Sequence, residues 1–116
     1  MACIQYSSGG SGGSRQALRI LREISGGSST ALGLGDSAGS RLRAGSGSET
    51  SGGGGNMKST TLNILDSPST TNAVTYQCQF AAIDGNDFKL NQSVADTNAS
   101  SYIRVASHIT VMEVSA

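Results

Sequence analysis

The chain has 116 residues, enough for one domain, and its eight basic and eight acidic residues give a formal net charge of zero. A neutral chain lacks the electrostatic footprint of a nucleic-acid binder, and no apolar run approaches the roughly 20 residues that cross a bilayer. We therefore expect neither nucleic acid nor a membrane as a partner. Aromatic residues make up only 4% of the chain, against 16 glycines. A core this thin predicts that subunits bury apolar surface against one another.

The first segment of the chain predicts a short strand followed by a loop. Residues 3–6 are typical of a strand, and residues 7–14 consist entirely of Gly and Ser, so we expect a surface loop there. Residues 16–24 place apolar side chains at a spacing that fits either a helical face or a strand whose alternation is broken by Arg22. The residues alone leave these two alternatives open.

The middle of the chain predicts two short strands, at residues 31–34 and 41–44, around a Gly-rich turn. Residues 46–55 include four consecutive glycines and are expected to form a second Gly/Ser-rich surface loop. Residues 60–66 predict a further strand, which ends before Pro68 because proline cannot donate to a strand ladder.

The clearest strand is predicted at residues 73–82. Alternate residues from Val74 to Phe80 are apolar or aromatic and the residues between them are polar or small, which indicates one buried face. Asp84-Gly85 follows, a dipeptide that supplies the positive φ of a tight hairpin turn. We therefore expect residues 88–91 to return beside this strand as the second half of a hairpin.

Residues 107–114 predict the last strand. Apolar side chains on both of its faces favour a central strand covered on both sides, with Glu113 at a sheet end or paired with a base. Residues 102–105 continue into this strand or form a separate short one. The total is seven to nine short strands with no long helix, which predicts an all-β fold: an antiparallel β-sandwich or jelly roll formed by residues 1–116 as one domain.

No residue pattern nominates a catalytic, cofactor-binding or metal-binding site, so we expect a protein that is not an enzyme. The one histidine, His108, lies in a predicted strand, where a structural histidine is commoner than a catalytic one. Four oxygen-bearing side chains resemble calcium ligands, but they lack the spacing of an EF-hand loop. These four are Asp84, Asn86, Asp87 and Asp96.

Cys3 and Cys78 lie in separate predicted strands and lack the spacing of a structural zinc site. A single disulfide between them stays open as an alternative, while two buried free thiols are expected if the protein is made in a bacterial cytoplasm. Two N-x-S sequons, at residues 91–93 and 98–100, are expected by chance in a chain so rich in Ser and Asn.

The first half of the chain is basic, with six bases against three acids in residues 1–58. Such residues occupy the polar faces of strands or form an electrostatic patch that faces a partner protein. The arginines concerned are Arg15, Arg19, Arg22, Arg41 and Arg43.

The second half of the chain resembles a domain found in virion proteins of tailed bacteriophages. The shared motifs are LDSPSTT (65–71), TY (75–76), NQS (91–93), SHITVMEV (107–114) and, upstream, ALGLGDSAGSRLRA (31–44). The chain departs from the usual pattern at Leu90 and Gln92, where valine or tyrosine and arginine are expected, and at His108, where threonine is commoner.

The resemblance implies a jelly-roll β-sandwich that serves as a non-enzymatic virion part without cofactors, often as a trimer, and it favours a strand for residues 16–24. A small, neutral domain without a coiled-coil shaft suits a capsid decoration or cement protein, bound as a homotrimer to the phage major capsid protein. The expected location is the capsid surface of the virion, after assembly in the host bacterial cytoplasm. The alternative is a tail-fibre or head-fibre tip that binds a host surface receptor.

Overall fold

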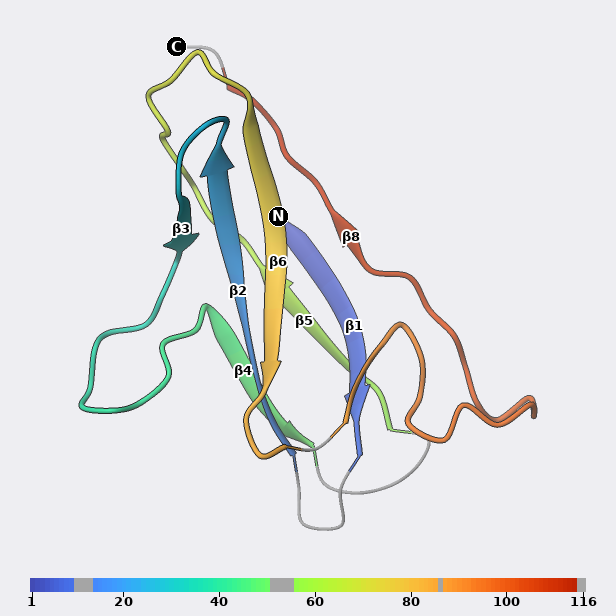
Figure 1. The fold of residues 1–116 in the computed structure, drawn as a ribbon. Coiled ribbons are helices and arrows are strands. Elements are labelled where there is room, and N and C mark those ends of the chain that lie inside the picture. The colour runs from blue at the N-terminus through green and yellow to red at the C-terminus, as the bar shows by residue number, and fades with distance from the viewer. Residues whose placement is uncertain (10–13, 51–55, 86, 115–116) are drawn as a thin grey trace.

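The computed structural model describes residues 1–9, 14–50, 56–85 and 87–114, and within these ranges the chain is all-β, with no helix (Figure 1). Its strands form two antiparallel sheets, which confirms the predicted sandwich of short strands. The strands are β1 (Ala2–Ser8), β2 (Ser14–Ile24), β3 (Ser29–Leu32), β4 (Ser46–Thr50), β5 (Lys58–Leu62), β6 (Val74–Ala82), β7 (Phe88–Leu90) and β8 (His108–Ile109). In the described part of the chain, no helix has the length and apolar character needed to cross a membrane.

Each sheet is built around one central strand. β1 pairs with β5 along one edge and with β7 and β8 along the other. β2 pairs with β6 along one edge, and with β3 and β4 along the other. In Figure 1, β2 and β6 stand side by side in front of β1 and β5, so the two sheets form the two layers of the sandwich.

Residues 16–24, which fit a helix or a strand equally well, belong to β2. Leu18 and Ile20 point into the sandwich and are 1% and 5% exposed, whereas Arg19 and Leu21, which alternate with them, are only half-buried. Neighbouring strands on both edges satisfy the backbone hydrogen bonds of β2, which a helix would have satisfied internally.

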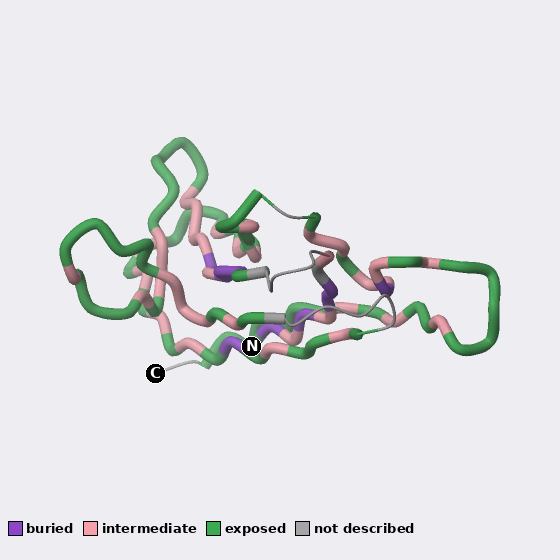
Figure 2. The backbone as a smooth tube through the Cα atoms, turned by 90° about the horizontal axis from the view of Figure 1, so that it is seen from below, coloured by how far each residue is buried: buried purple, intermediate pink, exposed green. Residues whose placement is uncertain are grey.

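The core lies between β1 and β2. Alternate residues of both strands fill it and β5 adds one leucine; its buried members are Ala2, Ile4, Tyr6, Leu18, Ile20 and Leu62. Tyr6 is fully buried, and its hydroxyl forms a hydrogen bond with Ser48 Oγ of β4, which ties the two sheets together. Figure 2 shows that the buried stretches are short and that most of the backbone is exposed or half-buried. The core is therefore as thin as the composition predicts.

The predicted hairpin between residues 73–82 and 88–91 is wrong. The first strand is present as β6, and Gly85 has the expected positive φ of 71°. However, β7 pairs with β1 in the opposite sheet. Ring stacking explains this placement: the centroid of Phe88 lies 4.2 Å from that of Phe80 on β6 and 5.2 Å from that of Tyr6 on β1. The turn therefore leads across the sandwich.

Two predictions for the middle of the chain are also wrong. Residues 41–44 form part of a loop, and residues 46–50, expected in a loop, form β4. Gly47 of β4 explains the second result, because a Cβ at this position would lie only 3.0 Å from the backbone oxygen of Gln16 on β2. Glycine therefore allows the two backbones to approach closely. Residues 51–55 of the predicted loop lie outside the described residues.

Other boundaries shift by a few residues. The loop predicted at residues 7–14 is shortened, since β1 continues to Ser8 and β2 begins at Ser14, with residues 10–13 outside the described ranges. The strand expected at residues 31–34 is present in part as β3, and the one expected at 60–66 ends early, at Leu62.

The prediction of a central last strand is wrong. Only His108 and Ile109 form β8, which pairs with β1 on one side. The last contact of this pairing lies between Met1 and Thr110, where each backbone nitrogen donates to the backbone oxygen of the other residue. The pairing goes no further because β1 lies at the start of the chain, from Ala2. From Val111 to Val114 the side chains are exposed, Glu113 included. Residues 102–105 contribute an isolated bridge between Arg104 and Gln92.

Candidate interaction surfaces

An apolar groove of about 820 Å³ opens between the two sheets, beside the first residues of β6. Its wall on the β2–β6 side includes Ile20, Leu32 and Tyr76. Ile64 and Leu65, which follow β5, line it as well, and Leu65 is 98% exposed. We call this feature the terminal groove.

The opposite wall of the terminal groove is formed by residues 110–114, which we call the arm. Val111, Met112 and Val114 of the arm are 61%, 83% and 86% exposed. Contiguous apolar side chains at such exposure mark interaction sites on soluble proteins. Sequence reasoning missed this surface, because it took the apolar residues on both faces of 107–114 as a sign of burial.

A polar cluster stands at the edge of the terminal groove. Arg22 Nη1 donates to Asp66 Oδ1 at 2.9 Å, and the Tyr76 hydroxyl donates to Asp66 Oδ2 at 2.9 Å. The Arg22 and Asp66 side chains are 18% and 15% exposed. Partial burial raises the pKa of Tyr76, and the hydrogen bond to Asp66 and the charge of that carboxylate raise it further, whereas Arg22 opposes the rise. The cluster joins β2, β6 and the segment after β5, so its first role is structural.

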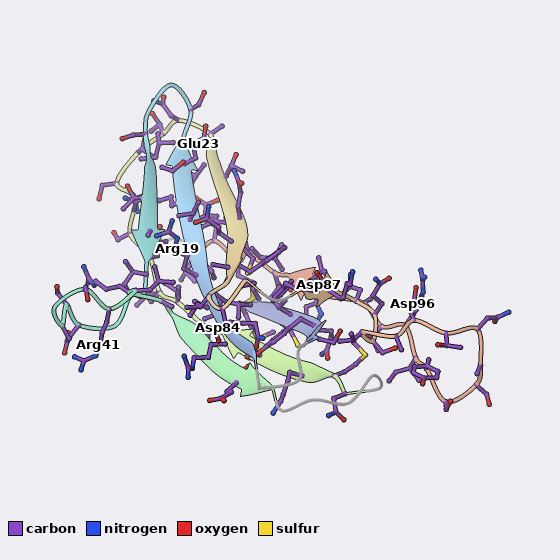
Figure 3. All side chains as sticks on the ribbon, turned by 60° about the horizontal axis from the view of Figure 1, so that its bottom comes forward. Arg19, Glu23, Arg41, Asp84, Asp87 and Asp96 are labelled. Carbon is purple, nitrogen blue, oxygen red and sulfur yellow. The ribbon has the colours of Figure 1, made fainter. Side chains whose placement is uncertain are left out.

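The second surface is the loop of residues 33–45, which projects from the body of the molecule (Figures 1 and 3). Figure 3 shows Arg41 far out on it, and Leu42 beside it is 59% exposed. Arg43 Nε donates to the backbone oxygen of Gly35 at 2.7 Å, and Gly35 N donates to that of Ala44 at 3.1 Å, which ties the two ends of the loop together. We call this feature the projecting loop.

A smaller groove of about 280 Å³ lies at the base of the projecting loop. Arg19 of β2, Phe80 of β6 and Leu42 and Arg43 of the loop line it. Arg19 Nε donates to Gln79 Oε1 at 2.6 Å, so this arginine lies along the outer face of the sheet. The surface combines apolar contacts with two guanidinium groups, a composition suited to a protein partner.

The structure separates the five arginines of the predicted basic patch. Arg19, Arg41 and Arg43 lie on or near the projecting loop. Arg15 pairs with Asp84 at 3.4 Å, and Arg22 belongs to the polar cluster with Asp66. A partner can thus reach three of the five arginines on one side, and Arg22 is already engaged within the fold.

The acids considered as calcium ligands lie apart. Asp84 pairs with Arg15, Asp87 pairs with Lys89 at 3.2 Å, and Asp96 pairs with Arg104. Figure 3 shows Asp84, Asp87 and Asp96 on separate parts of the molecule, and Asn86 lies outside the described residues. Among the residues that the structure describes, no three His, Cys, Asp or Glu side chains are grouped as a metal site requires.

His108 is exposed on β8. Its register partner is Cys3, a free thiol whose sulfur contacts Ser59 Oγ at 3.6 Å. Cys78 is also free. It lies on β6, in the sheet that does not contain Cys3, and its register partner there is the buried Ile20 of β2. Partial burial raises the pKa of Cys78. Both thiols are half-exposed, so the expectation of free cysteines agrees with the structure and the expectation of full burial does not.

Both sequons lie within the described residues. Asn91 Oδ1 accepts a hydrogen bond from the Ser107 hydroxyl at 2.6 Å, so this amide is part of the fold, whereas Asn98 is exposed. Ser93, the third residue of the first sequon, is fully buried, and its hydroxyl has no hydrogen-bond partner.

Comparison of the chain with protein-family models, with curated proteins and with solved structures finds no match.

Proposed function

We propose that this chain is a non-enzymatic structural protein of a bacteriophage virion, a capsid decoration or cement protein that binds the major capsid protein as a homotrimer. One observation carries the proposal beyond the sequence resemblance. Among the described residues, five large apolar side chains are buried, whereas eleven are exposed. A protomer with this distribution is suited to assembly, because the apolar side chains that are not buried in its own core are available for contacts with neighbouring subunits.

The projecting loop is the proposed contact with the capsid. Arg41 and Leu42 offer a cation beside an apolar side chain, and arginine is enriched in the centres of protein interfaces. The loop contains Arg41 and Arg43 against one acid, Asp36, so its net charge is small and positive. Three loops on a trimer would bind the shell together, so that a weak single contact becomes a stable attachment through avidity.

Electron cryo-microscopy of the intact virion tests this function. Many copies in icosahedral order on the shell are expected. A few copies confined to the tail or to fibre ends would contradict decoration and favour a receptor-binding tip, and absence of the chain from purified virions would contradict both.

The capsid contact is tested with a double variant, Arg41→Glu with Leu42→Asp. Arg43 stays in place because it holds the loop together, and Arg22 stays because it holds Asp66. Binding to empty shells should fall strongly, while a control variant, Arg15→Ala, should bind as the parent chain does. Arg15 is a suitable control because it is also exposed, at 63% of its side chain, and lies outside the loop. Equal binding by the double variant would refute the assigned contact.

A further inference from the structure

We infer that the free edge of β6 and the terminal groove together bind the arm of a second copy of this chain. The inference rests on the proposed assembly of the protein and deepens it by naming the joint between copies. It follows from four observations: an unpaired strand edge, an apolar groove beside it, an exposed apolar segment at the wall of that groove and an excess of exposed surface.

The edge is that of β6, which pairs only with β2 among the described strands. Two backbone hydrogen bonds at the ends of this pairing, from Ser25 N to Ala73 O and from Ile83 N to Arg15 O, show which residues of β6 direct their backbone groups toward β2. The odd residues of β6 bond to β2, and the even residues, including Tyr76 and Cys78, direct their N–H and C=O groups away from it. An incoming strand therefore finds a row of free backbone donors and acceptors.

Exposed edges of this length usually carry a charge or a proline that prevents pairing with other chains. The sequence of β6, VTYQCQFAA, contains neither, and it contains no glycine. A nine-residue edge without a charged residue or a proline is expected where the edge pairs with a strand of a partner.

The terminal groove adjoins this edge, because Tyr76 belongs to both. The side chains of the even β6 residues face the sandwich interior, opposite Ile20 and its neighbours in β2. A strand added to β6 would thus place alternate side chains in the groove. The groove wall is mainly apolar, so these side chains must be apolar too.

The arm has the required chemistry. After the pairing of Thr110 with Met1 it is extended, and it forms no described strand. Met112 and Val114 are two residues apart, so in a strand they share one face and enter the groove together. Glu113 then points to the opposite face, toward solvent.

The exposed area favours a second copy as the occupant. The protomer exposes 7403 Å², whereas a folded monomer of its mass exposes about 5,900 Å². Its radius of gyration is 16.2 Å, against about 13 Å for a compact chain of this length. The excess of roughly 1,500 Å² per protomer is enough for two standard interfaces. A protomer needs two in such an assembly, because its arm leaves the wall of its own groove to bind one neighbour, and the groove receives the arm of another. This head-to-tail contact closes into a ring when the rotation permits.

Cross-linking tests the inference directly, because β6 carries a native thiol at Cys78. The chain with Cys3→Ser and Met112→Cys is treated with a short bismaleimide and separated by denaturing electrophoresis. Cross-links between copies are expected, as a ladder that disappears when Cys78→Ser is added. Monomers cross-linked within one chain, or monomers without a cross-link, would overturn the inference, because the arm would then lie on its own β6 or away from any β6.

A second variant keeps the test independent of thiol reactivity. Met112→Asp with Val114→Asp should weaken self-association by about tenfold or more, because each substitution places a charged side chain where the proposed contact buries an apolar one. Light scattering measures the molar mass against concentration. Leu42→Asp is the matched control: it changes an equally apolar, exposed residue in the projecting loop and should leave the oligomer intact. A chain that is monomeric without any substitution, or an arm variant that associates normally, would overturn the inference.

The two proposals fail separately. Self-association is measured on the isolated chain, and capsid binding on shells. Loss of shell binding in Leu42→Asp with an intact oligomer leaves the arm exchange standing. Normal shell binding by a strictly monomeric chain would remove the arm exchange and leave decoration standing.

Discussion

Replacement of Arg22 by Ala should destabilise the fold, although Arg22 was a candidate for a partner-binding patch. Arg22 donates to Asp66, and both side chains are less than one-fifth exposed. Its removal leaves the Asp66 carboxylate half-desolvated, with the Tyr76 hydroxyl as its remaining donor. The variant therefore tests whether the polar cluster stabilises the fold or contributes nothing to its stability.

The expected loss lies between two known limits. An exposed ion pair contributes about 0–1 kcal/mol, whereas removal of one partner from a fully buried pair costs about 3–5 kcal/mol. With side chains 18% and 15% exposed, we expect a loss of about 2 kcal/mol in the free energy of unfolding. For a domain of this length that corresponds to a decrease of roughly 8 °C in Tm.

Thermal unfolding at one fixed protein concentration measures this loss, because self-association would make Tm depend on concentration. Arg19→Ala is the matched control: it lies on the same strand but on the outer face, where it hydrogen-bonds Gln79, and should change stability by less than about 0.5 kcal/mol. A double-mutant cycle with Asp66→Asn should give a coupling of about 1 kcal/mol. Equal losses in the two arginine variants, or no coupling, would refute the argument.

Three further predictions concern the core, the β2–β4 contact and pH. Leu18→Ala should cost about 3 kcal/mol in urea unfolding, because Leu18 is 1% exposed at the centre of a thin core. Gly47→Ala should lower the free energy of unfolding by about 1 kcal/mol, because the added Cβ would lie 3.0 Å from the backbone oxygen of Gln16. Gly35→Ala should be nearly neutral in the same assay, because its Cβ would lie 3.7 Å from the backbone oxygen of Ala44. Because the folded state raises the pKa of Tyr76, its contribution is complete below the unfolded value near 10 and is lost as pH rises above it. Tyr76→Phe should therefore flatten the fall in stability above pH 10, and an unchanged alkaline slope would contradict this.

Local patterns in the sequence predict the local structure well. The alternation from Val74 to Phe80 lies in a single strand, β6, as predicted, and the turn at Gly85 has its expected positive φ. The strand at the start of the chain is present as well. These features depend on side chains and turns only a few residues apart, so they can be recognised without knowledge of the fold.

Pairing across the sandwich is harder to predict, because it depends on residues far apart in the chain. β4 forms from a Gly/Ser segment only because β2 offers an edge and Gly47 allows a close approach. The projecting loop has an apolar pattern in residues 41–44 that resembles a strand, but no described strand pairs with it. Composition alone does not distinguish these two segments.

The wrong hairpin prediction and the unforeseen free edge of β6 have one origin. A hairpin would have placed residues 88–91 along β6 and covered its edge. The turn at Gly85 is compatible with either outcome, and the choice is made by Phe88, which stacks between Phe80 and Tyr6 and carries β7 to β1. The edge of β6 is left free for that reason. A substitution that removes the Phe88 ring should therefore affect the edge as well as the core, which connects the packing of three aromatic rings to the surface proposed for assembly.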